Sequence, residues 1–228
     1  MVSVIIEFIS GWLWLYLVWR NLRDSYQEEK LIGYSWMILL VFLVVGRITF
    51  GVVNWGVWNV RIVDWLLIWQ KKGFNYWGGL GAAVITTIWY CKLNNWKIWS
   101  FFEDITKIWY LLMGLVLIGE LIRGGFNWLT VAYFGVVIIG LVIALMIEGK
   151  YRSLVWYKSG KKGFVFFFTN MMGCLLAGVV GIILGEKLIV AGIFSGLCLI
   201  FMIGLFILGE VFNSLLVFGQ RRNSDKKE

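Results

Sequence analysis

The 228-residue chain has no histidine, no proline and few charged residues. The absence of an imidazole excludes serine–histidine and cysteine–histidine nucleophile activation, histidine-ligated zinc and ordinary haem ligation. Charged residues make up 15% of the chain and hydrophobic residues 61%, whereas a soluble domain has about 25% and 45–50%. The composition therefore predicts an integral membrane protein, in which any catalysis must use groups other than histidine.

The chain has only three cysteines, Cys91, Cys174 and Cys198, and each lies inside or at the end of an apolar run without Cys-x-x-Cys spacing. This pattern is typical of small core residues. The sequence also contains no metal-ligand cluster, phosphate-binding glycine loop or nucleic-acid module. We therefore expect no metal, no cofactor and no nucleic-acid partner.

Seven apolar runs are long enough to cross about 30 Å of hydrocarbon, which takes about 20 residues of helix. They predict an all-α protein with one seven-helix transmembrane domain over residues 1–218 and a basic tail at 219–228. The first run has no basic n-region or cleavage site, which indicates a retained helix. The predicted spans are 2–19, 31–53, 75–91, 105–122, 128–147, 164–184 and 188–209.

The basic residues are distributed unevenly between the two sides of these spans. Of the 21 lysines and arginines, 15 lie in or next to every second segment that connects two spans, or in the tail. The other six lie in or next to the connecting segments of the opposite side. The positive-inside rule then places the N-terminus outside and the C-terminal tail in the cytoplasm. The net charge of +8 is thus interpreted mainly as an orientation signal.

Several polar residues are predicted to gather at the outer ends of the spans. Arg47 lies 16 residues beyond Leu31, which is about 24 Å along a helix, and Glu120 and Arg123 are spaced to pair. These groups are interpreted either as snorkelling arginines and a register-setting ion pair, or as a basic pocket for a lipid phosphate. The third span opens at the same level with Tyr76, Trp77, Gly78 and Gly79.

Two further patterns concern helix placement. Residues 61–72 predict a short amphipathic helix in the membrane interface between the second and third spans, with a tilted loop as the alternative. Small residues recur every fourth position at Gly173, Ala177, Gly181 and Gly185, and again at Gly192 and Gly196. Such spacing favours close packing of the sixth and seventh spans, with a homodimer face as the alternative.

The order of several motifs resembles the prolipoprotein diacylglyceryl transferase family. VGRITFGVVNW at 45–55 is similar to the family's Gly-x-Arg second helix ending in Phe-Asn, and WGGLGA at 77–82 stands where the family has His-Gly-Gly. GELIRGGFN at 119–127 resembles its Gly-Gln-x-x-Gly-Arg-x-Gly-Asn motif, with one residue missing. DWLLIWQ at 64–70, KSGKKGFVFFF at 158–168 and VAGIFSGLCLI at 190–200 extend the resemblance over residues 20–210.

The resemblance implies seven spans and an enzyme of the bacterial plasma membrane. Its reaction moves a diacylglyceryl group from phosphatidylglycerol to the thiol of a lipobox cysteine at the outer leaflet, and glycerol phosphate leaves. The implied partners are therefore an anionic, phosphatidylglycerol-like phospholipid and the lipobox-bearing signal segment of a prolipoprotein.

The resemblance also assigns residues to this reaction. Arg123 and Arg47 carry over as groups for the phosphate, because the chemistry needs cations on the leaving group, and Glu120 is the suggested proton acceptor. The expected lipid- or substrate-binding residues are Arg47, Asn54, Tyr76, Trp77, Gly78, Gly79 and Asn127.

One departure leaves a second function open. Trp77 occupies the position of the family's histidine. The alternative is therefore a non-catalytic membrane protein that keeps the fold and binds lipid or a lipoprotein signal segment.

Overall fold

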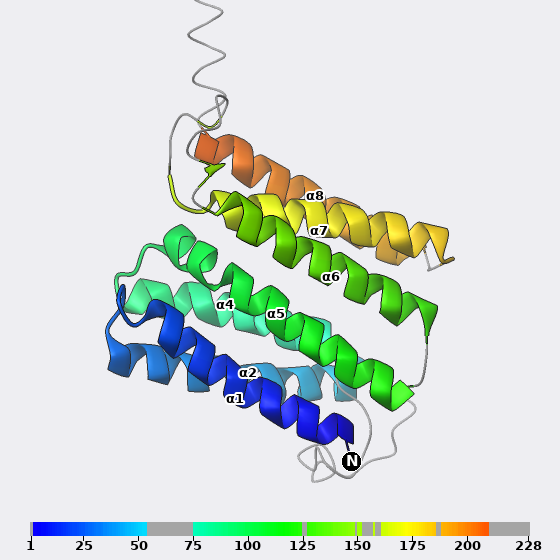
Figure 1. Ribbon diagram of the computed structural model, residues 1–228, viewed down its shortest axis with the longest axis horizontal. Helices are drawn as coiled ribbons and strands as arrows, with labels where there is room; N and C mark the ends of the chain where they lie inside the picture. The colour runs from blue at the N-terminus through cyan, green and yellow to red at the C-terminus, as the bar shows by residue number, and fades with distance from the viewer. Residues whose placement is uncertain are drawn as a thin grey trace, which may run out of the picture. The chain divides into compact units, whose positions relative to one another are not determined.

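The computed structural model describes residues 2–53, 75–124, 127–148, 150–151, 157, 161–185 and 188–209, without the side chains at 2–5, 7, 76–77, 123–124, 188–189 and 191. The described residues form seven α-helices (Figure 1). They are α1 (Val2–Leu22), α2 (Glu28–Val53), α4 (Tyr76–Leu93), α5 (Ile98–Gly124), α6 (Trp128–Ile147), α7 (Phe164–Ile183) and α8 (Leu188–Gly209).

The prediction of seven helices is confirmed for this described part of the chain, and each predicted span coincides with one helix. The largest difference is at α5, which begins at Ile98 and not at residue 105. Glu103 and Asp104 precede the predicted span, in the polar segment that connects it to the span before. They lie inside the helix because their carboxylates bind groups at the start of α7 and beside it.

Five of the described helices are long and apolar enough to cross a membrane, which indicates a multi-pass membrane protein. The other two, α1 and α4, are rich in tryptophan and tyrosine. The amphipathic rings of these residues favour the membrane interface over the hydrocarbon centre. The five candidates are Glu28–Val53, Ile98–Ile122, Trp128–Ile147, Phe164–Ile183 and Gly192–Gly209.

The contacts divide the chain into two compact units. We call Gly11–Ile98 the N-terminal unit, and Met1–Ser10 together with Trp99–Glu228 the C-terminal unit. The predicted single domain over 1–218 stays a prediction, as do the seven-span count and the orientation. The predicted interfacial helix at 61–72 and the tail at 219–228 lie outside the described residues.

In the N-terminal unit, α2 packs against both α1 and α4. The Trp14 indole nitrogen donates to the Ser35 carbonyl oxygen at 3.2 Å, which joins α1 to α2. The hydroxyl oxygens of Tyr34 and Thr87 lie 3.0 Å apart and join α2 to α4. All four side chains are buried, so these hydrogen bonds fix the helices where water does not compete.

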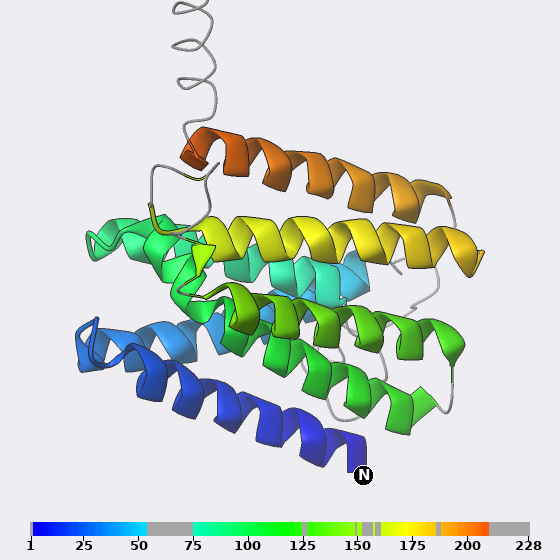
Figure 2. The ribbon, with the colours of Figure 1, turned by 45° about the horizontal axis from the view of Figure 1, so that its top comes forward.

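In the C-terminal unit, α6, α7 and α8 lie side by side, as Figures 1 and 2 both show. The predicted close packing of the last two helices is confirmed. Ala177 of the predicted stripe lies in one buried cluster with Phe194 of α8. Two glycines outside the stripe also contact the neighbouring helix, because a Cβ added at Gly178 would lie 3.4 Å from Phe194, and one at Gly204 would meet the Phe167 ring. By contrast, a Cβ at Gly192 would meet no described heavy atom within 4 Å.

Tyr110 of α5 connects three helices of the same unit. Its hydroxyl donates to the Thr169 carbonyl oxygen at 3.2 Å on α7. Its ring lies against Gly140 of α6, where an added Cβ would overlap it, and its oxygen would be 2.8 Å from a Cβ at Gly173. Tyrosine thus fills the space that two glycines leave, and this arrangement sets the register of α5, α6 and α7.

Candidate functional site

The first turn of α4 lies directly against the C-terminal half of α2 in the N-terminal unit. The Asn75 backbone nitrogen donates to the Gly46 carbonyl oxygen at 3.0 Å. A Cβ at Gly79 would lie 2.8 Å from the Phe42 carbonyl oxygen, and one at Gly78 would overlap the Thr49 side chain. The two glycines therefore allow a backbone approach that other residues would prevent.

Asn75 also shapes this turn by capping α4. Its side-chain oxygen accepts a hydrogen bond from the Gly78 nitrogen at 3.2 Å, and its extended backbone begins the helix. An asparagine at this position satisfies one of the amides that have no partner within the helix. The N-terminus of α4, with its partial positive charge, is thereby held next to Gly46.

Arg47 follows Gly46 directly and is buried, with 4% of the residue exposed. A buried guanidinium is stable only with acceptors or an anion nearby, because its desolvation is otherwise expensive. The N-terminus of α4 contacts Gly46, and the next residue is Arg47. The partial positive charge of this helix end and the guanidinium charge both favour an anion in this region. We take this arrangement of Arg47, Gly78, Gly79 and Asn75 as the candidate site and call it the α2–α4 site.

We expect Gly78→Ala to disturb the α2–α4 site, because the new methyl group would overlap Thr49. Overpacking of this kind typically costs about 1–3 kcal/mol. Gly81→Ala in the same helix is the matched control, since a Cβ there would meet no described atom within 4 Å. Detergent unfolding curves of the two variants measure the difference. Equal stabilities would show that the close approach at Gly78 is not needed.

The structure places Gly78 and Gly79 of α4 against the part of α2 that contains Arg47, and all three residues were predicted for the site. Tyr76 and Trp77 form the first turn of α4, but their side chains lie outside the described residues, as does Asn54 altogether. The Arg123 side chain is likewise outside them, and so its pairing with Glu120 stays a prediction.

The last two predicted residues belong to the C-terminal unit. Glu120 is half-buried near the end of α5. Asn127 caps α6, where its side-chain oxygen accepts from the Leu129 nitrogen at 3.0 Å. This oxygen therefore has a structural use in addition to the predicted contact with lipid.

No protein-family model, curated protein or solved structure matches this chain. The resemblance to the diacylglyceryl transferases therefore depends on the motifs of the sequence alone.

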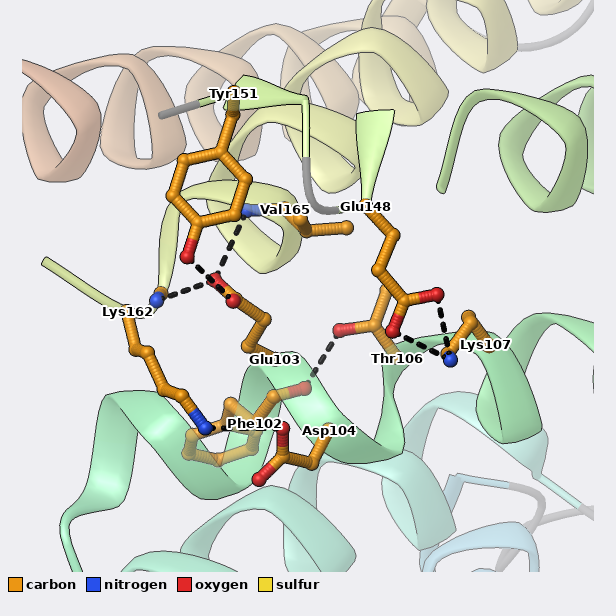
Figure 3. Close-up of polar contacts among 10 residues, drawn as sticks. Phe102, Glu103, Asp104, Thr106, Lys107, Glu148, Tyr151, Lys162 and Val165 are labelled. Carbon is orange, nitrogen blue, oxygen red and sulfur yellow. Dashed lines mark hydrogen bonds and ion pairs between the residues drawn. The ribbon is translucent and has the colours of Figure 1, made fainter. Parts of the chain in front are cut away.

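A second polar cluster lies where α5 meets the start of α7 in the C-terminal unit (Figure 3). The Glu103 carboxylate accepts hydrogen bonds from the Tyr151 hydroxyl at 2.9 Å, from the Gly163 nitrogen and from the Val165 nitrogen at 3.3 Å. Gly163 has a φ of 115° and provides no side-chain cap of its own for α7. Glu103 supplies that cap from another helix, where negative charge also suits the helix dipole.

Two ion pairs flank this cluster. The Lys107 ammonium lies 2.6 Å from the Glu148 carboxylate, and the Lys162 ammonium lies 3.8 Å from the Asp104 carboxylate. The carboxylates are thus engaged by cations and backbone amides. Among the described residues no group of three or more such side chains is placed to hold a metal ion. We interpret this cluster as structural.

Glu103 was not predicted from the sequence, because the backbone nitrogens that it binds are about 60 residues away in the chain. The only signal was the pair of acidic residues next to a predicted span. Charge there is normally assigned to a solvated joint. Only the contact with the first turn of α7 shows that the carboxylate belongs inside the fold.

Proposed function

We propose that the chain is a seven-span protein of a bacterial plasma membrane, with its N-terminus outside and its C-terminus in the cytoplasm, that binds an anionic phospholipid at the α2–α4 site. The observation that supports this is the buried Arg47 next to the glycine contact at the start of α4. A guanidinium and a helix N-terminus are two groups that proteins use for phosphate. A phosphatidylglycerol-like headgroup fits this chemistry.

We propose further that the bound lipid is a substrate, as the resemblance implies. The thiol of a lipobox cysteine attacks the glyceryl carbon that carries the phosphate ester. The new carbon–sulfur bond replaces the carbon–oxygen bond, glycerol phosphate leaves, and the thiol proton passes to Glu120 or to a water that it holds. The resemblance assigns the stabilisation of the charge on the leaving phosphate to Arg47 and Arg123.

A non-catalytic lipid-binding protein is the second candidate. Trp77 stands at the position of the family's histidine, and without it the thiol must be activated by another group. In this case the α2–α4 site would hold a phospholipid or a signal segment without turnover.

An assay of lipid transfer separates these candidates. The full chain is expressed in cells depleted of their own transferase, together with a reporter that carries a lipobox cysteine, and the thioether-linked lipid is measured by mass spectrometry. Lipidated reporter supports the enzyme. Its absence at full membrane expression rejects the enzyme, and retention of phosphatidylglycerol by the purified protein then supports the binding protein.

Substitution of Arg47 tests the site in either case. We expect Arg47→Gln to weaken phosphatidylglycerol binding at least about tenfold, because a hydrogen bond to a charged group contributes about 1.5–3 kcal/mol. Arg47→Lys keeps the charge but loses the planar donors, so a smaller loss is expected. Unchanged binding in a folded Arg47→Gln protein would reject the α2–α4 site.

A further inference from the structure

Two arginines at the end of α1, far from the α2–α4 site, are stacked on aromatic rings. Arg20 donates from Nη1 to the Tyr16 hydroxyl at 3.3 Å, and its Cζ lies 5.8 Å from the centre of that ring. The Cζ of Arg23 lies 4.8 Å from the centre of the Trp19 ring. Both arginines are exposed, so their remaining donors face the surroundings of the protein.

These guanidiniums point back along α1 and not past its end. Side chains of a helix tilt toward its N-terminus, and each ring lies about one turn before its arginine. The arginines therefore hold their charge at the level of Tyr16 and Trp19, over the body of the helix.

The packing of α1 on α2 shows at which level of the α2 span the two guanidinium groups lie. Trp14 contacts Ser35, and a Cβ at Gly11 would lie 3.1 Å from Leu39, so the two helices run antiparallel. On this register Trp19 is level with the first turns of α2, which is a candidate membrane span from Glu28. The two guanidiniums thus lie where that span begins, at the depth of lipid headgroups.

Neighbouring segments add charge and aromatic rings at the same end. The Tyr26 ring lies 4.8 Å from the Trp96 ring, which holds the α1–α2 and α4–α5 joints together. Exposed cations at this end are Lys92 in the last turn of α4 and Lys97 between α4 and α5. Exposed acidic residues there are Asp24 and, in the first turn of α2, Glu28 and Glu29. Asp24 approaches Arg23 Nε at 3.8 Å, an exposed pair of the kind that contributes little.

We propose that Arg20 and Arg23, with Tyr16 and Trp19, bind the phosphates of anionic phospholipids in the leaflet at this end of the protein. Guanidinium groups offer planar sets of donors that match phosphate oxygens, and tyrosine and tryptophan prefer the same interfacial depth. The α2–α4 site is elsewhere, since Arg47 lies 17 residues after Lys30, or about 25 Å along α2. The proposal does not depend on the proposed function.

Native mass spectrometry of the detergent-purified full chain tests this site with phosphatidylglycerol and, as a neutral comparison, phosphatidylcholine. We expect the double variant Arg20→Gln/Arg23→Gln to bind phosphatidylglycerol about thirtyfold more weakly, because two basic residues near a membrane surface together contribute about 2 kcal/mol. Phosphatidylcholine binding should be unchanged. Arg221→Gln/Arg222→Gln removes the same charge elsewhere and should have little effect.

The outcomes are distinct. Equal losses in the two double variants would mean that net charge, and not this site, attracts the lipid, which overturns the proposal. Unchanged phosphatidylglycerol binding in Arg20→Gln/Arg23→Gln overturns it as well. If that variant does not fold, Arg20→Lys/Arg23→Lys replaces it, and a weakened affinity for phosphatidylglycerol supports the site whereas an unchanged one rejects it.

Discussion

Glu103→Ala is expected to destabilise the C-terminal unit by about 3 kcal/mol, because a hydrogen bond typically contributes about 1 kcal/mol net and this variant removes three at once. The lost partners are the Tyr151 hydroxyl and the backbone nitrogens of Gly163 and Val165. These two backbone nitrogens lie at the start of α7, where the N-cap residue Gly163 has no side chain that could accept a hydrogen bond. Unfolding in sodium dodecyl sulfate, followed by circular dichroism, measures the change.

Two variants in the same cluster calibrate this result. Tyr151→Phe removes one hydrogen bond and should cost about 1 kcal/mol. Lys107→Ala removes an ion pair whose side chains are 29% and 50% exposed, and such pairs contribute at most about 1 kcal/mol. Hydrogen exchange should also quicken at Gly163 and Val165 in Glu103→Ala alone. If Glu103→Ala costs no more than Lys107→Ala, the capping role is wrong.

Gly140→Leu is expected to cost about 3 kcal/mol, at the upper end of the range for added volume in a packed core. Even a Cβ at this position would overlap the Tyr110 ring. That ring cannot move freely, because its hydroxyl donates to the Thr169 carbonyl oxygen and lies against Gly173. The larger side chain must therefore separate α6 from α5 or break the hydrogen bond to α7.

Gly135→Leu is the matched control in the same helix. A Cβ at Gly135 would meet no described atom within 4 Å, and leucine is a better helix former than glycine by up to about 1 kcal/mol. Its stability should equal or exceed that of the unchanged protein. Tyr110→Ala should partly restore the stability of Gly140→Leu, because the two changes act on one contact. Additive losses in that double variant would contradict the proposed steric cause.

The helices were predictable because their signal is local. An apolar run of about 20 residues indicates a helix without reference to any other segment, and all seven predicted spans coincide with described helices. The start of α5 was the exception. Its first turns carry Glu103 and Asp104, and charged residues are assigned to a helix only when their partners are known.

The candidate site was predictable in part. Arg47, Gly78 and Gly79 were selected from short motifs, and the structure brings their two helices together through the Asn75–Gly46 hydrogen bond. Asn127 was selected from a motif as well, and its contact with lipid stays a prediction. Its side-chain oxygen also caps α6, a role that depends on where the helix begins.

The sequence by itself determined that the protein is apolar, that it contains no histidine chemistry and where its helices lie. These properties depend on composition and on neighbours along the chain. Only the tertiary structure decided which glycines lie against a neighbouring side chain. A Cβ added at Gly78, Gly140 or Gly204 would overlap one, whereas a Cβ at Gly81, Gly135 or Gly192 would meet no described atom within 4 Å. The tertiary structure also decided that Glu103 caps α7. The reason is that such contacts join residues far apart in sequence, so no local pattern can specify them.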